Sequence, residues 1–227
     1  MSEPTLQDRF HLIGIGGAGM SVVAELLVSR GATVEGSDRE ESAVLEHLRS
    51  VGVRAFVGHE ASHVDPASVV VVSTAIREDN PELEIARERG QLVIHRSQAL
   101  ALAASGMRFV GVAGAHGKTT TSGMLAIALS ACGLDPSVAV GGVLPQLGTG
   151  AHLGAGDVFV AEADESDGSF LNYSPAIEIV TNVEPDHLDR YHSREEFEEI
   201  FVEFARRLVH GGLLVTCAED EGAGRLA

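Results

Sequence analysis

Short apolar runs alternate with helical patterns along the whole of the 227-residue chain. The fully apolar run at residues 69–72 is typical of a strand buried on both faces of a parallel sheet. Residues 194–208 place large apolar side chains at helical spacing, which predicts an amphipathic helix. Further strands are expected near residues 10–13, 33–36, 53–57, 91–94, 109–113, 137–140, 157–162, 177–180 and 213–216, and helices near 20–30, 42–51, 81–89, 97–105 and 119–132. This alternation predicts an α/β fold built on parallel sheets.

Residues 109–124, FVGVAGAHGKTTTSGM, have the layout of a phosphate-binding loop: a strand, a glycine-rich turn, and Gly-Lys-Thr opening a helix. Glycines let backbone N–H groups converge on phosphate oxygens, and the helix N-terminus adds partial positive charge. Lys118 is the only lysine of the chain, and its mobile ammonium suits β/γ-phosphates, while the Thr119 hydroxyl suits Mg²⁺. The candidate phosphate-binding residues are Gly114, Ala115, His116, Gly117, Lys118, Thr119 and Thr120.

The strict form of this motif would place its first glycine at position 112, which is Val112 in this chain. A glycine-rich turn without a ligand therefore stays open as the alternative. The unique lysine favours the phosphate-binding interpretation, because the other fifteen basic residues are all arginine.

A second glycine-rich turn, GIGGAG at residues 14–19, lies between an expected strand and an expected helix. This is the context in which the G-x-G-x-x-G motif predicts a nucleotide site. Asp38 follows 19 residues after Gly19, where a nicotinamide-dependent dehydrogenase would place an acid on a ribose hydroxyl. The backbone N–H groups of such a turn contact the pyrophosphate and do not distinguish one nucleotide base from another. The motif therefore indicates a nucleotide diphosphate in general. An NAD-dependent dehydrogenase stays open as an alternative function.

Polar residues near two other strand ends are weaker candidates. Ser73 and Thr74 follow the apolar run at 69–72, and ligands of open α/β sheets bind beyond the carboxyl ends of strands. A plain loop start is the alternative for both residues. His59 and His63 lack metal-ligand spacing, and His63 is expected on the surface.

Carboxylates gather after the strand expected at residues 157–162. Glu162 ends that strand, and three more acids follow by residue 167. In phosphate-loop enzymes an acid at such a strand end helps to hold Mg²⁺, whereas a solvated acidic loop is the alternative. His187 lies near Asp186 and Asp189 and is either a metal ligand oriented by carboxylates or a structural histidine. The glycine-rich residues 141–156 are expected to form a long loop.

Composition narrows the class of protein. The net charge of −17 argues against a nucleic-acid partner and against an anionic membrane surface. Cys132 and Cys217 are expected to be small buried side chains in a reducing compartment. The chain shows neither a signal peptide nor an apolar run long enough to span a membrane, so a cytoplasmic protein is expected.

Together these motifs resemble the Mur ligase family. The resembling segments are GIGGAGMS (14–21), GSD (36–38), VVVSTAI (70–76), GAHGKTTT (114–121), AEADESDGSFL (161–171) and TNVEPDHLDRY (181–191). The resemblance implies an ATP-dependent ligase of peptidoglycan precursor synthesis, with a Rossmann-like UDP-binding domain at 1–106 and a P-loop ATPase-type domain at 107–227. ATP would phosphorylate the lactyl carboxylate of UDP-N-acetylmuramate, and the amino group of L-alanine would attack the resulting acyl phosphate.

The resemblance also implies roles for single residues. Lys118, Glu162 and His187 would be catalytic, with ATP phosphates on Lys118 and the loop amides. Mg²⁺ would bind at Thr119, Glu162 and His187. The UDP moiety would lie near Gly14, Gly16, Gly17, Ala18, Gly19, Met20, Asp38, His59, Ser73 and Thr74.

The chain departs from the family pattern at three points. Ala115 stands where the family usually has threonine, and Gly150 where it usually has asparagine. No lysine follows Lys118, so the carbamylated lysine of several relatives is absent.

The family has three domains and this chain ends inside the second, so the L-alanine site is expected in a missing C-terminal domain. We therefore expect a fragment that binds nucleotide without ligase turnover, or a non-catalytic UDP-sugar-binding module.

Overall fold

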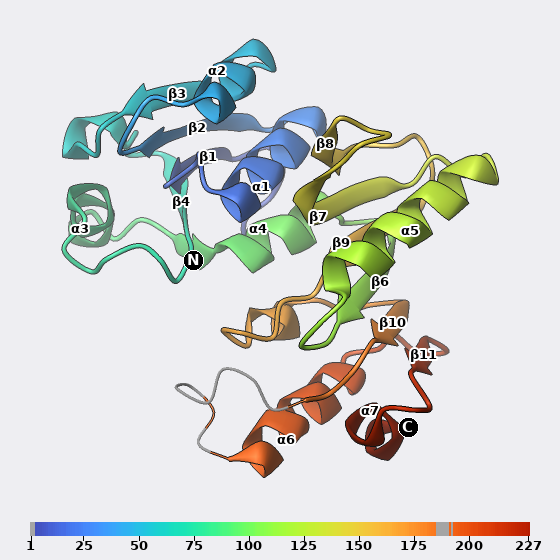
Figure 1. The fold of residues 1–227 in the computed structure, drawn as a ribbon. Helices are drawn as coiled ribbons and strands as arrows, with labels where there is room; N and C mark the ends of the chain where they lie inside the picture. Colours follow the sequence, from blue (N-terminus) through green and yellow to red (C-terminus); the bar gives the residue numbers. More distant parts are fainter. Residues whose placement is uncertain (1–2, 185–190, 192) are drawn as a thin grey trace. The chain divides into compact units, whose positions relative to one another are not determined.

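The computed structural model describes residues 3–184, 191 and 193–227. The chain divides into two compact units, Met1–Ser105 and Gly106–Ala227, and each has its own sheet and helices (Figure 1). Within the described ranges no helix has the length and apolar character needed to cross a bilayer.

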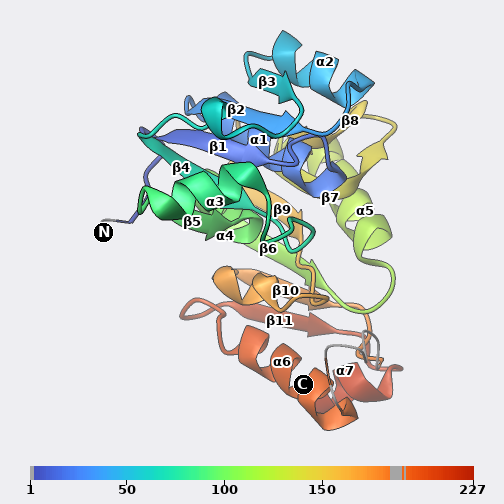
Figure 2. The same cartoon turned by 90° about the vertical axis from the view of Figure 1, so that its left-hand side faces the viewer.

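The first unit is built on a five-stranded parallel sheet with the strand order β3-β2-β1-β4-β5. Its elements are β1 (Arg9–Ile13), α1 (Ala18–Ser29), β2 (Thr33–Asp38), α2 (Ala43–Ser50), β3 (Arg54–Val57), the 3₁₀ helix η1 (Ala61–His63), β4 (Ser68–Val72), α3 (Pro81–Glu88), β5 (Val93–His95) and α4 (Arg96–Ala103). Helix α2 lies against β3 at one edge of the sheet (Figure 2). The strand order reverses beside β1, which confirms the predicted Rossmann-like domain.

The core of this unit lies on both faces of β1, because alternate side chains of a strand point to opposite faces. Phe10 and Leu12 are fully buried on one face. On the other face Ile13 packs with residues of β4 and α3, among them Val70 and Leu83. His11 shares this second face, so a titratable ring lies inside the sheet packing.

The second unit has a six-stranded sheet with the order β11-β10-β6-β9-β7-β8, in which only β8 runs antiparallel to its neighbour among the described strands. Its elements are β6 (Arg108–Ala113), α5 (Lys118–Ala131), β7 (Ser137–Leu144), β8 (Thr149–His152), β9 (Val158–Glu162), the 3₁₀ helix η2 (Ser169–Asn172), β10 (Ile177–Val180), α6 (Arg194–Ala205), β11 (Leu213–Thr216) and α7 (Glu221–Leu226). The predicted α/β class is therefore confirmed for both units.

The prediction of a long loop at residues 141–156 is wrong. Strand β7 continues to Leu144, and β8 pairs with it as a hairpin. Glycine at position 150 is what allows this close pairing: a Cβ there would lie 2.6 Å from the carbonyl oxygen of Val140 and 2.7 Å from that of Gly142. A larger residue at position 150 would require the two strands to move apart.

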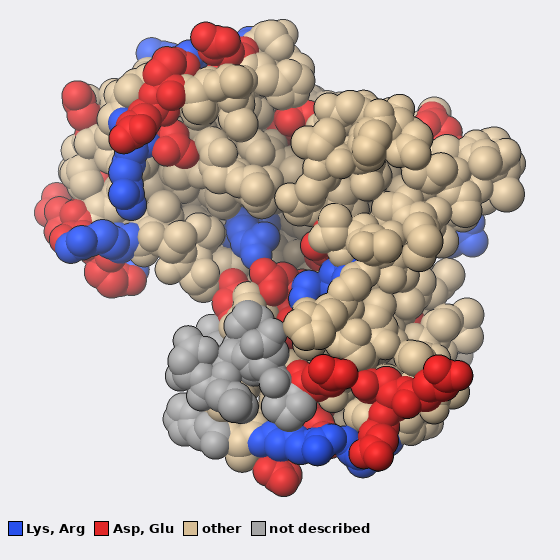
Figure 3. Space-filling view, in the orientation of Figure 1, with Lys and Arg blue, Asp and Glu red and all other residues tan. Residues whose placement is uncertain are grey.

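Helix α6 covers one face of the second sheet with aromatic side chains. Phe197, Phe201 and Phe204 are fully buried, and Phe204 stacks on Phe170 with ring centroids 4.5 Å apart. The helix ends at Ala205, three residues before the predicted end. Acidic and basic side chains alternate over the outer side of α6 (Figure 3), where Glu198 pairs with arginines of α6 and α7.

The expectation that both cysteines are buried is wrong, since Cys132 and Cys217 are exposed. Cys132 caps the C-terminal end of α5, and Cys217 follows β11, which lies at the edge of the sheet. Each cysteine lies at the end of a helix or strand, at the surface of the unit. The apolar residues next to it in the sequence therefore do not cover its side chain.

Glu178 is a buried carboxyl on β10, in register with Gly111 of β6. Neither of its side-chain oxygens has a hydrogen-bond partner among the described residues. Burial raises the pKa of Glu178 from its ordinary value of 4.5 to about 8. The folded chain therefore holds this proton over a range in which the unfolded chain releases it, and stability falls as the pH rises from 4.5 to 8.

We expect Glu178→Leu to raise the free energy of unfolding by about 1–3 kcal/mol at pH 8, because it removes a buried polar group without a partner. The gain should shrink as the pH falls toward 5. Urea denaturation at both pH values measures it, with the exposed Glu195→Leu on α6 as the control. A gain that does not change with pH would contradict this account of Glu178.

Candidate functional site

The glycine-rich loop between β6 and α5 (Figure 1) is held by two residues that follow β10. Asn182 clamps the peptide of His116: its side-chain oxygen accepts the His116 N–H at 3.0 Å, and its Nδ2 donates to the His116 carbonyl at 2.9 Å. The Thr181 hydroxyl also donates to that carbonyl, at 2.6 Å. Gly114 must be glycine, because its φ is 131° and a Cβ would lie 2.2 Å from Thr181 Oγ1. The loop is therefore preformed by contacts within the unit.

The loop places its functional groups at the start of α5. Gly117 adopts a left-handed conformation, with φ 84°, and precedes the first helical residue, Lys118. His116, Gly117, Thr119 and Thr120 are exposed, while Gly114 is buried and Ala115 is half-buried. No side chain caps this helix, so its first N–H groups suit an anion.

The ammonium of Lys118 is paired with Glu165, a residue that sequence reasoning did not single out. Its Nζ lies 2.9 Å from each carboxylate oxygen of Glu165 and donates to the Gly114 carbonyl at 2.7 Å. Glu165 is completely buried, so the acidic run at 162–167 is not a uniformly solvated loop. Burial raises the pKa of Glu165, and the ammonium opposes that rise. No local sequence signal singles out Glu165, because it lies 47 residues from Lys118 in the sequence.

Thr119 and Glu162 lie against the same short segment of β7. The carboxylate of Glu162, at the end of β9, accepts the Gly141 N–H at 2.9 Å. A Cβ at Gly142 would lie 3.3 Å from Thr119 Cγ2. Both side chains offer oxygen atoms, the ligands that Mg²⁺ prefers, and Mg²⁺ commonly takes only one or two carboxylates from the protein.

His187, the third predicted metal ligand, lies outside the described residues. Among the residues that the structure does describe, no group of three or more His, Cys, Asp or Glu is arranged to hold a metal ion. The described part of the site thus supplies two oxygen donors next to the phosphate loop.

The glycine-rich loop of the first unit is tied to the end of β2. The N–H groups of Gly14 and Ile15 donate to the Ser37 carbonyl at 2.8 and 2.9 Å, and that of Gly16 donates to Asp38 Oδ2 at 2.8 Å. Asp38 therefore holds the loop in shape.

Gly17 precedes α1 without a side-chain cap, so the first turn at Ala18 and Gly19 is open to an anion. The side chain of Met20 is buried and belongs to the core. Arg96 is a further residue that sequence reasoning missed: its guanidinium occupies the space in which a Cβ of Gly19 would lie, at 2.8 Å from Nη1. An arginine directly after a strand, at the start of α4, was the available signal.

The remaining candidates of this unit lie along the same edge of the sheet. Half-buried Ser73 and exposed Thr74 follow β4. His59 follows β3, and its Nδ1 lies 2.8 Å from Ser37 Oγ and 3.4 Å from Glu82 Oε2. The ring of His59 is thus oriented by two buried groups.

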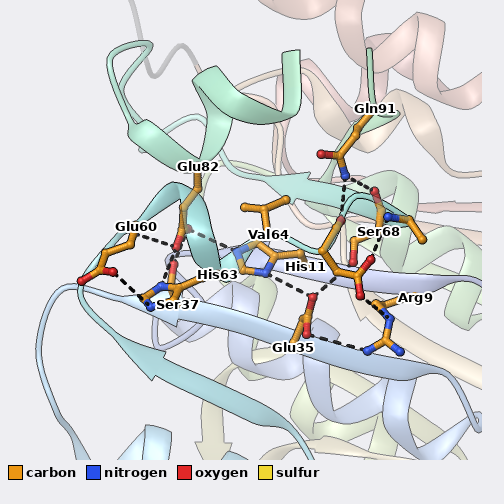
Figure 4. Close-up of polar contacts among 12 residues, drawn as sticks. Arg9, His11, Glu35, Ser37, Glu60, His63, Val64, Ser68, Glu82 and Gln91 are labelled. Atoms are coloured by element: carbon orange, nitrogen blue, oxygen red, sulfur yellow. Dashed lines mark hydrogen bonds and ion pairs between the residues drawn. The ribbon is translucent and has the colours of Figure 1, made fainter. Parts of the chain in front are cut away.

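Glu82 of α3 is the centre of a buried polar cluster (Figure 4). Its carboxylate accepts from the Ser37 hydroxyl and from the Glu60 N–H, and lies 3.3 Å from His11 Nε2. His63 is also part of it, with Nδ1 3.2 Å from Glu82 Oε1. Its side chain is 14% exposed, so the expected surface position of His63 is only partly met.

His11 lies between two carboxylates, with Glu82 on one side and Glu35 3.8 Å from its Nδ1 on the other. Burial lowers the pKa of His11, but the two carboxylates raise it and prevail. Burial likewise raises the pKa of Glu35 and Glu82, but their hydrogen bonds and charge contacts with His11 outweigh it and lower both values. The cluster is a set of charges that stabilise one another inside the unit.

Glu82→Gln should lower the free energy of unfolding by about 3–5 kcal/mol at pH 6, because it removes one partner of a buried charged pair. The Glu82 contribution is present above pH 4.5 and lost as the pH falls through its lowered pKa, so the difference should shrink in acid. The measurement is chemical denaturation at pH 6 and pH 3.5. Glu84→Gln, exposed on the same helix, is the matched control, and equal losses for the two variants would contradict the assigned role.

Two α/β units, each with a glycine-rich loop between its first strand and first helix, define a protein of the nucleotide-binding α/β class. Residues 9–108 match the family model described as Mur ligase family, catalytic domain, and residues 112–227 match the Mur ligase middle domain. The chain belongs to the Mur ligase family.

The chain is 55% identical to the UDP-N-acetylmuramate–L-alanine ligase of Renibacterium salmoninarum, over 96% of this chain and 47% of that protein. Among solved structures, it resembles the UDP-N-acetylmuramate–alanine ligase of Thermotoga maritima with a TM-score of 0.85 and 34% identity, over 97% of this chain and 51% of that one. It also resembles the UDP-N-acetylmuramate:L-alanyl-gamma-D-glutamyl-meso-diaminopimelate ligase of Neisseria meningitides, with a TM-score of 0.89 and 28% identity, over 97% and 74%. The chain spans about half the length of the curated relatives that it matches.

Proposed function

We propose that this chain is the UDP-binding and ATP-binding part of a ligase that joins L-alanine to the lactyl carboxylate of UDP-N-acetylmuramate, in peptidoglycan precursor synthesis. The observation that carries the proposal is the preformed phosphate loop with the single lysine, in a chain 55% identical to a named L-alanine ligase. We also propose a cytoplasmic location, because ATP and sugar nucleotides are the proposed ligands.

In the second unit, the loop amides and Lys118 would bind the ATP phosphates. Thr119 and Glu162 would hold Mg²⁺, together with His187. When bound there, Mg²⁺ supplies neutralisation of phosphate charge during phosphoryl transfer. The chain's own residues hold the loop in place: Asn182 bonds to the backbone of His116, and the N-terminus of α5 would face the bound phosphates.

In the first unit, the N-terminus of α1 would bind the UDP pyrophosphate at Gly17, Ala18 and Gly19, with Arg96 beside it. Asp38 keeps the loop in place through its bond to the Gly16 N–H. His59 follows β3, and Ser73 and Thr74 follow β4, at the same edge of the sheet, where the nucleoside would bind.

The L-alanine site is proposed to lie in the part of the relatives that this chain does not span. The chain by itself would then bind both nucleotides without turnover, and in that form it acts as a binding module. A dehydrogenase is opposed by the match of residues 112–227 to the Mur ligase middle domain, because that function would leave Gly117-Lys118-Thr119 without a role.

Calorimetric titration with UDP-N-acetylmuramate is expected to show saturable binding to this chain, with NADH as the control ligand that does not bind. The physical reason is that the α1 N-terminus recognises a pyrophosphate, while the neighbouring strand ends select the sugar nucleotide. Binding of NADH alone would overturn the proposed function and return Asp38 to a dehydrogenase role.

Lys118→Ala is expected to weaken ATP binding by about tenfold to a hundredfold, the usual effect of losing a hydrogen-bonded charge contact. Binding of UDP-N-acetylmuramate should stay unchanged, because that site is proposed in the other unit. Arg108→Gln is the control, since this exposed cation of the same unit pairs with Asp157. Equal loss of ATP affinity in both variants would contradict the role of Lys118, because it would show that any lost positive charge in this unit weakens ATP binding.

A further inference from the structure

The Lys118 ammonium is bonded to oxygen atoms of two residues of the chain. A lysine ammonium carries three donors and no acceptor. The acceptors are the two carboxylate oxygens of Glu165, each at 2.9 Å, and the Gly114 carbonyl at 2.7 Å. The carboxylate holds the ammonium symmetrically, so a phosphate that draws Nζ toward itself works against this ion pair.

Of the two partners in the ion pair, Glu165 is the anchored one. Its side chain is completely buried, whereas 17% of the Lys118 side chain is exposed. The backbone carbonyl of Glu165 accepts the Tyr191 hydroxyl at 2.5 Å, and Tyr191 is buried against Phe197 of α6 with ring centroids 5.3 Å apart. The same carbonyl accepts the Gly168 N–H at 3.1 Å. When the pair opens, the flexible lysine moves and the glutamate stays.

The Gly114 carbonyl is a poorer candidate for replacement. Gly114 is locked between β6 and the Thr181–Asn182 segment, where a Cβ would meet Thr181 Oγ1 at 2.2 Å. Its bond to Nζ also spans a single turn of the loop, from residue 118 back to residue 114. The carboxylate is the partner that repels an incoming phosphate, because both carry negative charge.

We propose that Glu165 is a positioning residue that holds the Lys118 ammonium at the loop and competes with nucleotide phosphates for it. Nucleotide binding then includes an exchange, in which the ammonium passes at least one hydrogen bond from the carboxylate to a phosphate oxygen. The proposal rests on the proposed binding of ATP by this loop. The exchange selects for ligands with enough phosphate charge to displace a carboxylate, so ADP and ATP bind and AMP binds far more weakly.

The test compares Glu165→Gln with Asp164→Asn by calorimetric titration with ADP. Both changes remove one negative charge, but the Asp164 carboxylate accepts the Ser166 N–H instead of the ammonium. Glu165→Gln should tighten ADP binding by about fivefold to tenfold, as expected when a competing ion pair is lost. Asp164→Asn should stay within about twofold of the unchanged chain on the same basis. Unchanged or weaker ADP binding by Glu165→Gln would overturn the proposal.

The single lysine allows a second measurement that needs no nucleotide. Protein labelled with ¹⁵N on lysine side chains gives one Nζ signal, which belongs to Lys118. Bonded to a buried carboxylate, the ammonium should exchange slowly with water and give an observable proton-coupled signal. Glu165→Gln should broaden or lose it, and Asp164→Asn should keep it. The same signal in all three proteins would overturn the positioning role.

The two measurements separate failure of this inference from failure of the proposed function. If the unchanged chain binds no ADP, the proposed function and the competition both fail, while the Nζ signal still decides whether Glu165 holds the ammonium. Thermal unfolding checks that each variant folds. If Glu165→Gln does not fold, Glu165→Asp replaces it: the shorter side chain keeps the charge but cannot reach Nζ with both oxygens, so a smaller gain, about twofold to threefold, is expected. No gain in that variant would overturn the competition.

Discussion

Parallel strands bring their carboxyl ends to one edge of a sheet, and both candidate sites depend on that constraint. In the first unit, residues that follow β1, β2, β3 and β4 meet there, because all four strands run in one direction. In the second unit, the phosphate loop follows β6, Glu162 ends β9, and Asn182 follows β10, the two neighbours of β6. Loop shape is then set locally: an aspartate ties one glycine-rich turn, and an asparagine clamps the other.

Three buried glutamates show three ways in which a fold deals with a desolvated carboxyl. Glu82 is surrounded by donors from several elements and keeps a lowered pKa. Glu165 faces the single lysine and forms an ion pair at the phosphate loop. Glu178 is buried without a hydrogen-bond partner among the described residues, and its pKa rises to about 8. Burial is the same in each case, so the available donors decide the charge state.

The three glutamates also differ in their roles. Glu82 accepts a hydrogen bond from Ser37 (Figure 4) and lies 3.4 Å from His59 Nδ1, so it holds two side chains near the edge where the sugar nucleotide is proposed to bind. The Glu165 pair lies within the phosphate loop itself and sets what an incoming phosphate must displace. Glu178 lies in the middle of β10, where a buried carboxyl without a hydrogen-bond partner among the described residues costs stability.

The sequence by itself determined most of the helices and strands and the two glycine-rich turns. The apolar run at 69–72, the glycines at 14–19 and 114–117 and the unique Lys118 depend on local periodicity and backbone freedom, which nearby residues encode. The partners of these groups depended on tertiary structure, because they come from distant parts of the chain. Glu165 lies 47 residues from Lys118, and Glu82 lies 71 residues from His11. The partial burial of His63, the exposure of both cysteines and the pairing of β7 with β8 were also decided by tertiary structure, since the packing of other elements determines which residues meet water.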